Sequence, residues 1–329
     1  MVLQVAAFIS RRWCVPPDLC RVDLEPLQGG LESTVAWARV SGAEGDARIP
    51  TQFVIKELPP GLEREADVYE TLWQHLDRPP AVRVIGREVA AQKTWLYLEH
   101  AQPSSPWPWS DTQVAGAVCR SLARLHESHV PHETFAWDYE AQLARSAQST
   151  LDLARAARSP SGRRFWRRCG DLRRVVAALP RIRDRLLSGA TSIIHGDMHP
   201  GNVILRGGAA SDVVFIDWAR ARIGSPLEDV AAWLHSLGCW EPEARRRHDT
   251  LMRIYLDARR TSQPFGSDVR TDYWFASASN GLAGAIRYHL AVLSDPETSE
   301  AARYDSRRAL NAWERVIRRA AVLISTWDR

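Results

Sequence analysis

The sequence predicts an α+β protein with a small antiparallel sheet in an N-terminal lobe and a mainly helical C-terminal lobe. Short strand-like runs, bounded by turn residues, follow one another over residues 24–98. The three prolines within residues 103–108 then form a stiff connector, and helical periodicity dominates beyond it. We therefore place the N-terminal lobe at 1–102, with a hinge near 99–103, and the C-terminal lobe at 103–329.

The N-terminal lobe alternates strand patterns with one helical pattern. Val68, Tyr69 and Leu72 recur at helical spacing, so their segment is expected to be a helix between the third and fourth strands. Runs with strand alternation supply the sheet. The expected elements are a hairpin over 24–40 with its turn at Gln28–Thr34, a strand over 52–58, a helix over 62–76, and strands over 82–89 and 94–98.

The C-terminal lobe opens with a helix over Asp111–Glu127, capped by Ser110 or Asp111. A short strand and a hairpin interrupt the helices that follow. The other expected elements are helices within 138–157 and 163–188, a strand at 192–194, a tight hairpin of 203–205 and 213–216, and helices after Pro226 with a break near 262–267.

Composition is that of an ordinary soluble globular chain, with 45% hydrophobic and 25% charged residues and a net charge of +4. Scattered basic residues argue against a nucleic-acid partner. The sequence contains no run of about 18 apolar residues, so no membrane span is expected. Arg11 and Arg12 follow the apolar start, whereas a signal peptide carries its charge first. The five dispersed cysteines lack zinc-ligand spacing and indicate reduced thiols in a cytoplasmic protein.

The most informative segment is HGDMHPGN at residues 195–202. Asp197 precedes Asn202 by five positions, and Asp217 follows at the end of the apolar run 213–216. Phosphoryl transfer needs one carboxylate beside the attacking hydroxyl. It also needs an amide oxygen and a second carboxylate that hold magnesium against the nucleotide phosphates. The spacing predicts these roles for Asp197, Asn202 and Asp217.

Lysine is rare in this chain, and its position is informative. Only Lys56 and Lys93 are lysines among 43 basic residues, and Lys56 lies in the expected strand 52–58. Lysine is a compact point charge, well suited to a phosphate site. Glu65 lies one helical turn before Tyr69 on the inward face, and an inward carboxylate needs a partner. We predict an ion pair between Lys56 and Glu65, whereas Lys93 has no such context.

These residues resemble the aminoglycoside phosphotransferase and choline kinase superfamily, whose fold is similar to that of protein kinases. The resemblance implies a protein kinase-like bilobal fold. The HGDxHxxN string is its specific element, and the last 90 residues, where this family makes its substrate choice, carry no matching motif. The matching pieces stand in the family's order from residue 28 to about 235: Gly29-Gly30 with Ser33-Thr34, Lys56, REA at 64–66, LARLH at 122–126, HGDMHPGN at 195–202, IDW at 216–218 and PLEDVA at 226–231.

The resemblance implies an ATP-dependent small-molecule kinase that phosphorylates a hydroxyl group. Asp197 would accept or orient the proton of the substrate hydroxyl. Asn202 and Asp217 would bind Mg²⁺, and Lys56, held by Glu65, would neutralise nucleotide phosphates.

The resemblance also assigns the nucleotide contacts made by the backbone. The chain around Gly30 and Ser33 would cover the phosphates, where glycine permits a close approach. The backbone at Glu99 and Ala101 would meet the edge of the adenine.

Three histidines and one aspartate are expected to be structural rather than to react. His195 and Asp229 resemble braces of this loop in the family. His126 ends an amphipathic helix, which favours a packed and hydrogen-bonded histidine over a ligand. For His199 we favour bracing over contact with phosphate.

Two rival functions remain. A nucleotide-binding pseudokinase or scaffold would have no need of Asp197. A protein kinase would have HRD in place of HGD, and an activation segment where this chain has a short hairpin from Asn202 to Asp217.

The acceptor is expected to meet the helices after Pro226. From residue 240 onward there are 12 acidic residues and 15 arginines, which weighs against a polycationic aminoglycoside. The arginine runs 163–168 and 245–247 are interpreted as solvated helix faces. Large side chains that could shape or charge an acceptor pocket are Trp233, Trp240, Tyr273, Trp274 and Arg287.

Overall fold

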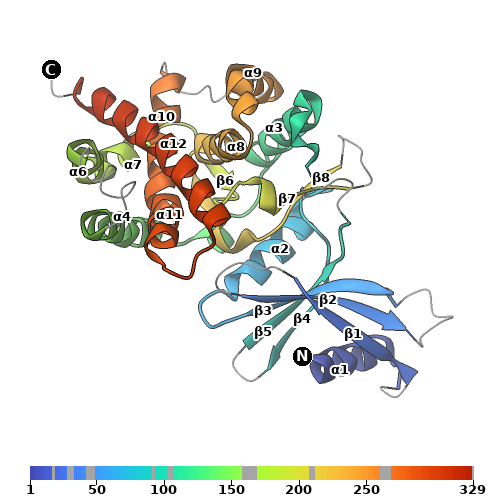
Figure 1. Cartoon of the computed structure of the whole chain (residues 1–329). Helices are drawn as coiled ribbons and strands as arrows, with labels where there is room; N and C mark the ends of the chain where they lie inside the picture. The colour runs from blue at the N-terminus through green and yellow to red at the C-terminus, as the bar shows by residue number, and fades with distance from the viewer. Residues whose placement is uncertain are drawn as a thin grey trace. The chain divides into compact units, whose positions relative to one another are not determined.

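The computed structural model describes residues 1–16, 19–27, 33–41, 49–90, 93–102, 107–157, 169–206, 212–259 and 268–327 (Figure 1). The chain forms two compact units. The first comprises Met1–Ser105 with Ile204–Ala219, and the second comprises Pro106–Val203 with Arg220–Arg329. Asp217, which is expected to bind Mg²⁺, therefore belongs to the same unit as Lys56.

The first unit is built on a five-stranded antiparallel sheet in the order β1-β2-β3-β5-β4. The single helix between the third and fourth strands is α2, as the sequence predicts. The turn expected at Gln28–Thr34 falls mostly outside the described residues. The elements are β1 (Arg21–Pro26), β2 (Thr34–Ser41), β3 (Gln52–Leu58), α2 (Arg64–His75), β4 (Val84–Ala90) and β5 (Lys93–Glu99).

An N-terminal helix, α1 (Val2–Trp13), was not predicted. Its buried residues Val5, Phe8 and Ile9 have helical spacing and pack into the core of the sheet. The Phe8 ring stacks on Tyr97 with centroids 3.6 Å apart. A Cβ on Gly86 of β4 would come within 2.6 Å of the Phe8 ring, so a glycine is needed there.

The first unit also contains a short hairpin that leads to Asp217. Its strands are β7 (Val203–Leu205) and β8 (Val213–Phe215), and the glycine turn between them lies outside the described residues. The backbone N–H of Phe215 donates to the carbonyl of Pro80 at 2.8 Å. This bond fixes the end of β8, immediately before Asp217, beside the segment that leads into β4.

The second unit is mainly helical. Most of its helices pack around one apolar cluster, which extends from Tyr139 to Ile324. Its helices are α3 (Thr112–His126), α4 (Tyr139–Ala156), α6 (Cys169–Ala177), α7 (Leu179–Ser188), α8 (Pro226–Trp240), α9 (His248–Ala258), α10 (Val269–Asn280), α11 (Ile286–Ser294) and α12 (Glu300–Ile324).

Several details of the second unit differ from the sequence expectations. The helix expected within 163–188 is two helices, α6 and α7, with Pro180 in the first turn of α7, where proline is tolerated. A short strand, β9 (Arg222–Gly224), pairs with β6 (Ser192–Ile194) and was not predicted. A π-helical turn at Gly281–Ala285 joins α10 to α11. The break expected near 262–267 lies outside the described residues.

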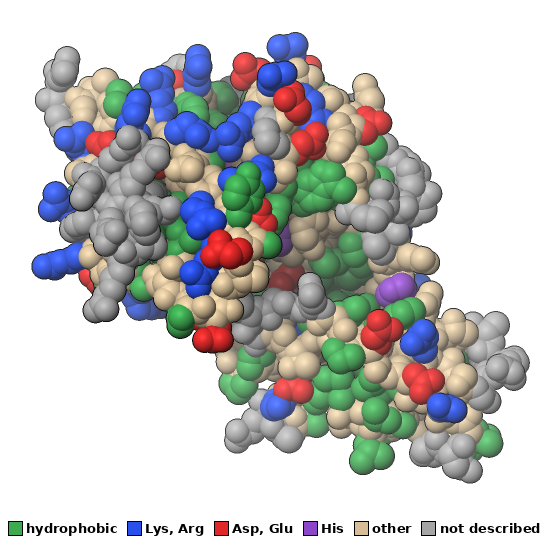
Figure 2. Space-filling view, viewed as in Figure 1, with side chains coloured by type: hydrophobic (Ala, Val, Ile, Leu, Met, Phe, Trp, Pro, Cys, Tyr) green, Lys and Arg blue, Asp and Glu red, His purple; other side chains and the backbone are tan. Residues whose placement is uncertain are grey.

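Asp111 caps α3, as one of the two predicted candidates, and its carboxylate accepts from the backbone N–H of Gln113 at 2.7 Å. On the face shown in Figure 2, basic and acidic side chains are interspersed over the larger unit. Among the described segments, no helix has the length and apolar character that a membrane crossing requires.

Candidate active site

Lys56, on β3, is buried and holds two carboxylates. Its Nζ lies 2.8 Å from Oε1 and 2.7 Å from Oε2 of Glu65, which comes from the inward face of α2. The same Nζ lies 3.0 Å from Oδ1 of Asp217. The predicted ion pair between Lys56 and Glu65 is therefore confirmed, and Asp217 joins it.

Two acids and one ammonium give this group, the lysine cluster, an unbalanced charge. Burial alone would lower the pKa of Lys56, but the charges and hydrogen bonds of Glu65 and Asp217 outweigh it and raise that pKa. Burial raises the pKa of Glu65 to about 7, although Lys56 opposes this shift. When both acids are ionised, the cluster carries one net negative charge, which favours the approach of a cation.

Asp217 is the open end of the lysine cluster. Its side chain is 30% exposed, whereas Glu65 is completely buried. Its φ of 64° lies in the left-handed region, which costs a non-glycine residue free energy and often marks a functional position. Its backbone N–H donates to the Tyr69 hydroxyl at 3.2 Å, which holds this conformation.

The other nucleotide residues predicted from the resemblance are only partly described. Gly30 lies outside the described residues, and Ser33 lies just before β2. The backbone N–H of Glu99 donates to the carbonyl of Arg83 at 2.8 Å, and its carboxylate binds Arg206. At Glu99 the backbone carbonyl, and not the N–H, could therefore meet an adenine. Ala101 is buried two residues later. These nucleotide contacts stay predictions.

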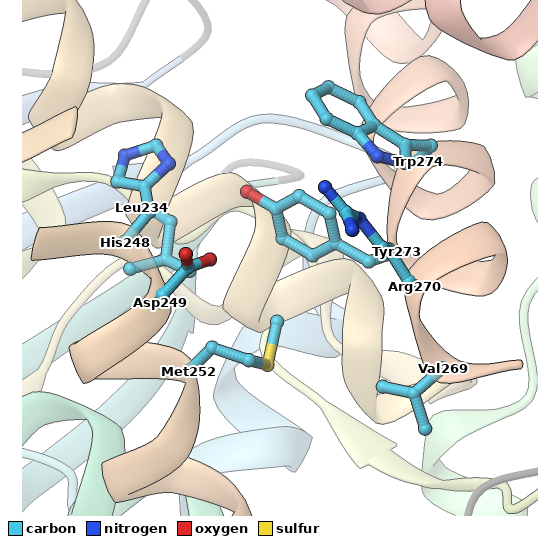
Figure 3. Close-up of a pocket in the computed structure, with 8 residues that line it drawn as sticks. All are labelled: Leu234, His248, Asp249, Met252, Val269, Arg270, Tyr273 and Trp274. Carbon is cyan, nitrogen blue, oxygen red and sulfur yellow. The ribbon is translucent and has the colours of Figure 1, made fainter. Parts of the chain in front are cut away.

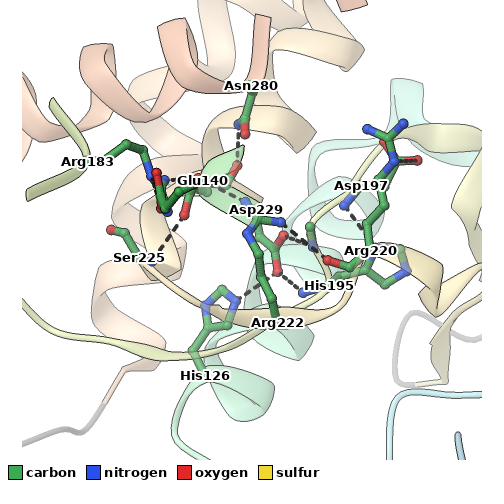
Figure 4. A network of polar contacts seen from close by, with 12 residues as sticks. His126, Glu140, Arg183, His195, Asp197, Arg220, Arg222, Ser225, Asp229 and Asn280 are labelled. Atoms are coloured by element: carbon green, nitrogen blue, oxygen red, sulfur yellow. Dashed lines mark hydrogen bonds and ion pairs between the residues drawn. The ribbon is translucent and has the colours of Figure 1, made fainter. Parts of the chain in front are cut away.

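In the second unit, Asp229 organises the loop that follows β6 (Figure 4). Its Oδ2 accepts from the backbone N–H of His195 at 2.7 Å, and its Oδ1 accepts from that of Gly196 at 2.8 Å. The His126 ring holds the same carboxylate at 3.1 Å and the Tyr255 hydroxyl at 2.8 Å. His126 is thus a buried histidine with both ring nitrogens bonded, as predicted, and Asp229 braces the loop.

Gly196 is required at its position for two reasons. Its φ is 81°, in the region that favours glycine, and a Cβ there would come within 2.3 Å of the Arg220 carbonyl oxygen. The tight passage turns the chain so that the next residue, Asp197, is presented outward. This explains the glycine where protein kinases have arginine.

Asp197 and Asn202 end this loop in different environments. The Asp197 carboxylate is 40% exposed, and among the described residues its nearest charged partner is Arg220, with Nε at 3.9 Å. Asn202 is buried and donates from Nδ2 to the Asp197 carbonyl at 2.9 Å, which leaves its amide oxygen for other contacts. The His199 ring accepts from the Gly201 N–H at 3.1 Å, consistent with a bracing role.

Asp217 in the first unit and Asn202 in the second each offer an oxygen that suits a magnesium ion. A carboxylate and an amide oxygen are hard ligands, and magnesium usually takes few protein ligands plus phosphates and water. Among the described residues, no cluster of three or more His, Cys, Asp or Glu could hold a metal alone. Asp217 and Asn202 belong to different units, so their joint role stays a prediction.

Comparison with known proteins supports phosphoryl transfer. A model of the phosphotransferase enzyme family matches residues 23–265. The chain belongs to this family. It is therefore a phosphotransferase, as the HGDxHxxN string indicated. No curated protein sequence matches the chain.

Solved structures show that this phosphotransferase has the protein kinase-like α+β fold. Choline kinase from Cryptosporidium parvum is 12% identical, with 99% of each chain covered and a TM-score of 0.63. A choline/ethanolamine kinase family protein from Mesorhizobium loti is 15% identical, covering 96% of this chain and 95% of that one, with a TM-score of 0.60. A thermostable mutant of aminoglycoside phosphotransferase APH(4)-Ia, solved with ADP and hygromycin B, is 16% identical, with 96% and 98% covered and a TM-score of 0.53.

One group of supporting residues in the phosphotransferase was missed from the sequence. The arginine cluster is defined as Arg183, Arg222 and Glu228, all buried. Glu228 Oε1 accepts from Arg183 at 2.6 Å and from Arg222 at 3.0 Å, and Arg222 also donates to the Arg220 carbonyl at 3.3 Å. Ser225 and Glu228 form a capping box at the start of α8, and this pattern was the available signal.

The large side chains expected to shape an acceptor pocket lie in different environments. Trp233 is completely buried and packs edge-on against Trp109, so it belongs to the core. In the 245–247 run, Arg245 and Arg246 are exposed, as expected, whereas Arg247 is half-buried and donates to backbone oxygens of Trp109 and Ser110. The run 163–168 lies outside the described residues.

Tyr273 and Trp274 line a cavity of about 360 Å³ between α8, α9 and α10 (Figure 3). Leu234 of α8, in its wall, lies five residues after Asp229, about 7–8 Å along the helix axis. Trp274 lies about 9 Å along α10 before Asn280, whose side chain binds the Glu228 carbonyl. The cavity is thus one to two helical turns away from the end of α8 that braces the catalytic loop.

Proposed function

We propose that this phosphotransferase transfers the γ-phosphoryl group of ATP to a hydroxyl group of a small molecule. One observation carries the proposal. Of the two aspartates at the HGD loop, Asp229 is buried and bonded to the backbone, whereas Asp197 is exposed and accepts no hydrogen bond from a described side chain. A carboxylate held in place without a structural task is available for a substrate.

In the proposed step, the acceptor hydroxyl attacks the γ-phosphoryl group of ATP. The acceptor oxygen forms a bond to the γ-phosphorus, and the bond between that phosphorus and the β,γ-bridging oxygen breaks. The bridging oxygen leaves with ADP, and the hydroxyl proton passes to the Asp197 carboxylate. Asp197 is the general base in this scheme.

The nucleotide would be held by the lysine cluster. The Lys56 ammonium, oriented by Glu65, would bind phosphate oxygens, and Asp217 and Asn202 would hold Mg²⁺. The metal, when bound, would neutralise charge on the transferring phosphate. When Glu65 and Asp217 are both ionised, their charges exceed that of Lys56 by one, which supports a cation at this place.

Two further points support the proposal. The relative with ADP and hygromycin B was solved with a nucleotide and a small molecule together. Free thiols are found at Cys14, Cys20, Cys119 and Cys239, which fits work in the cytoplasm, where ATP is supplied.

A screen for ATP consumption tests the function. The purified chain is incubated with ATP and Mg²⁺ and a panel of hydroxyl metabolites and antibiotics, and ADP formation is measured together with the mass of the phosphorylated acceptor. At least one acceptor should be converted. Tight ATP binding with no acceptor converted would favour the pseudokinase, and no nucleotide binding at all would reject both functions.

A further inference from the structure

Arg220 has a guanidinium that lies beside the proposed base and donates no hydrogen bond to a described residue. Its side chain is 34% exposed, and its Nε lies 3.9 Å from Oδ2 of Asp197, beyond hydrogen-bond range. No described residue accepts a hydrogen bond from it, although a guanidinium carries five N–H donors. Figure 4 shows its head group beside the Asp197 carboxylate.

Arg222, two residues later, shows what a structural arginine looks like in this chain. It is 2% exposed, its guanidinium binds Glu228 and the Arg220 carbonyl, and it lies 3.5 Å over the Tyr139 ring. Glu140, the other acid of this region, is bonded to Arg183. Glu228 and Glu140 are therefore already paired with arginines, whereas the charged group nearest to Arg220 among the described residues is Asp197, 3.9 Å away.

A second element approaches Arg220 from the C-terminal helices. The π-helical turn Gly281–Ala285 brings Gly284 close to it, since a Cβ on Gly284 would lie 3.7 Å from Arg220 Nη1. π-Helical turns within helices occur frequently at functional sites. Arg287, three residues after Gly284, is exposed and has no charged partner among the described residues. Arg220 is thus the arginine that the structure places beside Asp197, and the π-helical turn borders it.

We propose that the acceptor carries an anionic oxyacid group, a carboxylate or a phosphate, close to the hydroxyl that is phosphorylated, and that Arg220 binds this group. The proposal rests on the proposed function, because it takes Asp197 to mark the place of the hydroxyl. The planar guanidinium fork matches both carboxylate and phosphate in a two-bond geometry.

The short distance between Arg220 and Asp197 limits the acceptor further. A hydroxyl that reaches Oδ2 of Asp197 lies within a few bonds of any anionic group that reaches Arg220. Acceptors with the hydroxyl on the carbon next to the acid group, or one carbon further, satisfy both contacts.

Matched sets of acceptors test the proposal. Each set contains a hydroxy acid, its neutral amide, the corresponding amino alcohol and the hydroxyalkyl phosphate of the same carbon skeleton. We expect turnover of the acids or of the phosphates, with the amides and amino alcohols at least about tenfold poorer in kcat/KM. The comparison of the acid with the phosphate identifies which anion the site takes.

Variants of Arg220 separate the acceptor from the nucleotide. Arg220→Gln should raise KM for the anionic acceptor by about 10- to 100-fold, as expected for loss of a charge-assisted pair of hydrogen bonds, and leave KM for ATP unchanged. Arg220→Lys should recover part of the loss. Arg246→Gln, which removes an exposed arginine paired with Glu243, serves as the control and should change neither KM.

Other outcomes overturn the proposal without touching the proposed function. Turnover of neutral or cationic acceptors in preference to the anions would overturn it. A rise in KM for ATP alone in Arg220→Gln would also overturn it, because this arginine would then bind the transferring phosphate. Where no acceptor of any class is turned over, the same sets are titrated calorimetrically against the protein with ADP and Mg²⁺. Acids or phosphates must bind more tightly than amides, and Arg220→Gln must abolish the difference, or the proposal is wrong.

Discussion

The lysine cluster and the arginine cluster are both groups of buried charges among the described residues, but they differ in their exposure to solvent. The arginine cluster is sealed, since Arg183, Arg222 and Glu228 are each at most 4% exposed. The lysine cluster has a closed end at Glu65 and an open end at Asp217, which is 30% exposed. The arginine cluster ties helices and a strand together, whereas the lysine cluster leaves a carboxylate facing solvent. An incomplete cluster of charges therefore marks the site, and a complete one marks its support.

The largest effect is expected for Glu228→Ala, which disrupts the arginine cluster. The change leaves Arg183 and Arg222 buried without their shared carboxylate, which should lower the free energy of unfolding by about 3–5 kcal/mol. Chemical unfolding monitored by tryptophan fluorescence measures it. Glu140→Ala is the matched control, because it removes an exposed partner of Arg183 and should cost at most about 1 kcal/mol. Equal losses in the two variants would show that the cluster is not a buried support.

Acid should weaken the helical unit through its histidines. Burial lowers the pKa of His235 to about 3 and that of His289 to about 4, and it also lowers the pKa of His126 and His248. The unfolded chain takes up protons near pH 6.5 while the folded chain does not. Stability is therefore complete above that pH and is lost as the pH falls towards the folded pKa values, by about 1.4 kcal/mol per pH unit for each histidine.

Unfolding measured between pH 7.5 and 5 checks this loss. His289→Gln should reduce the slope of stability against pH by the contribution of one histidine. A stability that does not vary with pH over this range would contradict the burial of these rings as neutral groups.

The smallest expected effect concerns the open end of the lysine cluster. Nucleotide affinity should rise with Mg²⁺, and Asp217→Ala should remove that dependence, a difference of about tenfold or 1.4 kcal/mol. Titration of ADP with and without Mg²⁺ measures it in both proteins. The idea of a metal site at Asp217 fails if the wild-type protein binds ADP equally in both conditions and shows no metal activation of turnover.

Much of this arrangement could be predicted because its signals are local. The pair of Lys56 and Glu65 followed from a strand and the inward face of the next helix, only nine residues apart. The bracing role of Asp229 followed from a family motif, and the packed, hydrogen-bonded state of His126 followed from a helical pattern. The helix α1 carried the same kind of signal in Val5, Phe8 and Ile9, but its apolar start was weighed only against a signal peptide, which was rejected, and not as a helix.

What could not be predicted depends on residues distant in the chain. Glu228 accepts from Arg183, which is 45 residues away, and nothing local pairs them. The strand β9 has three residues, too few for a visible alternation. The approach of Gly284 to Arg220 joins the π-helical turn to the end of the Asp217 segment, across more than 60 residues. Sequence patterns describe elements, and these contacts arise only when the elements pack.

The most direct test of the account compares turnover and nucleotide affinity in Asp197→Asn. The substitution keeps the shape of the side chain and removes its ability to take the hydroxyl proton, so kcat should fall by about 10²- to 10⁴-fold. Affinity for ADP with Mg²⁺ should not change, because the lysine cluster is intact. Asp152→Asn, on the exposed face of α4, should behave as wild type. Turnover within about threefold of wild type in Asp197→Asn would contradict the assignment of Asp197 as the base.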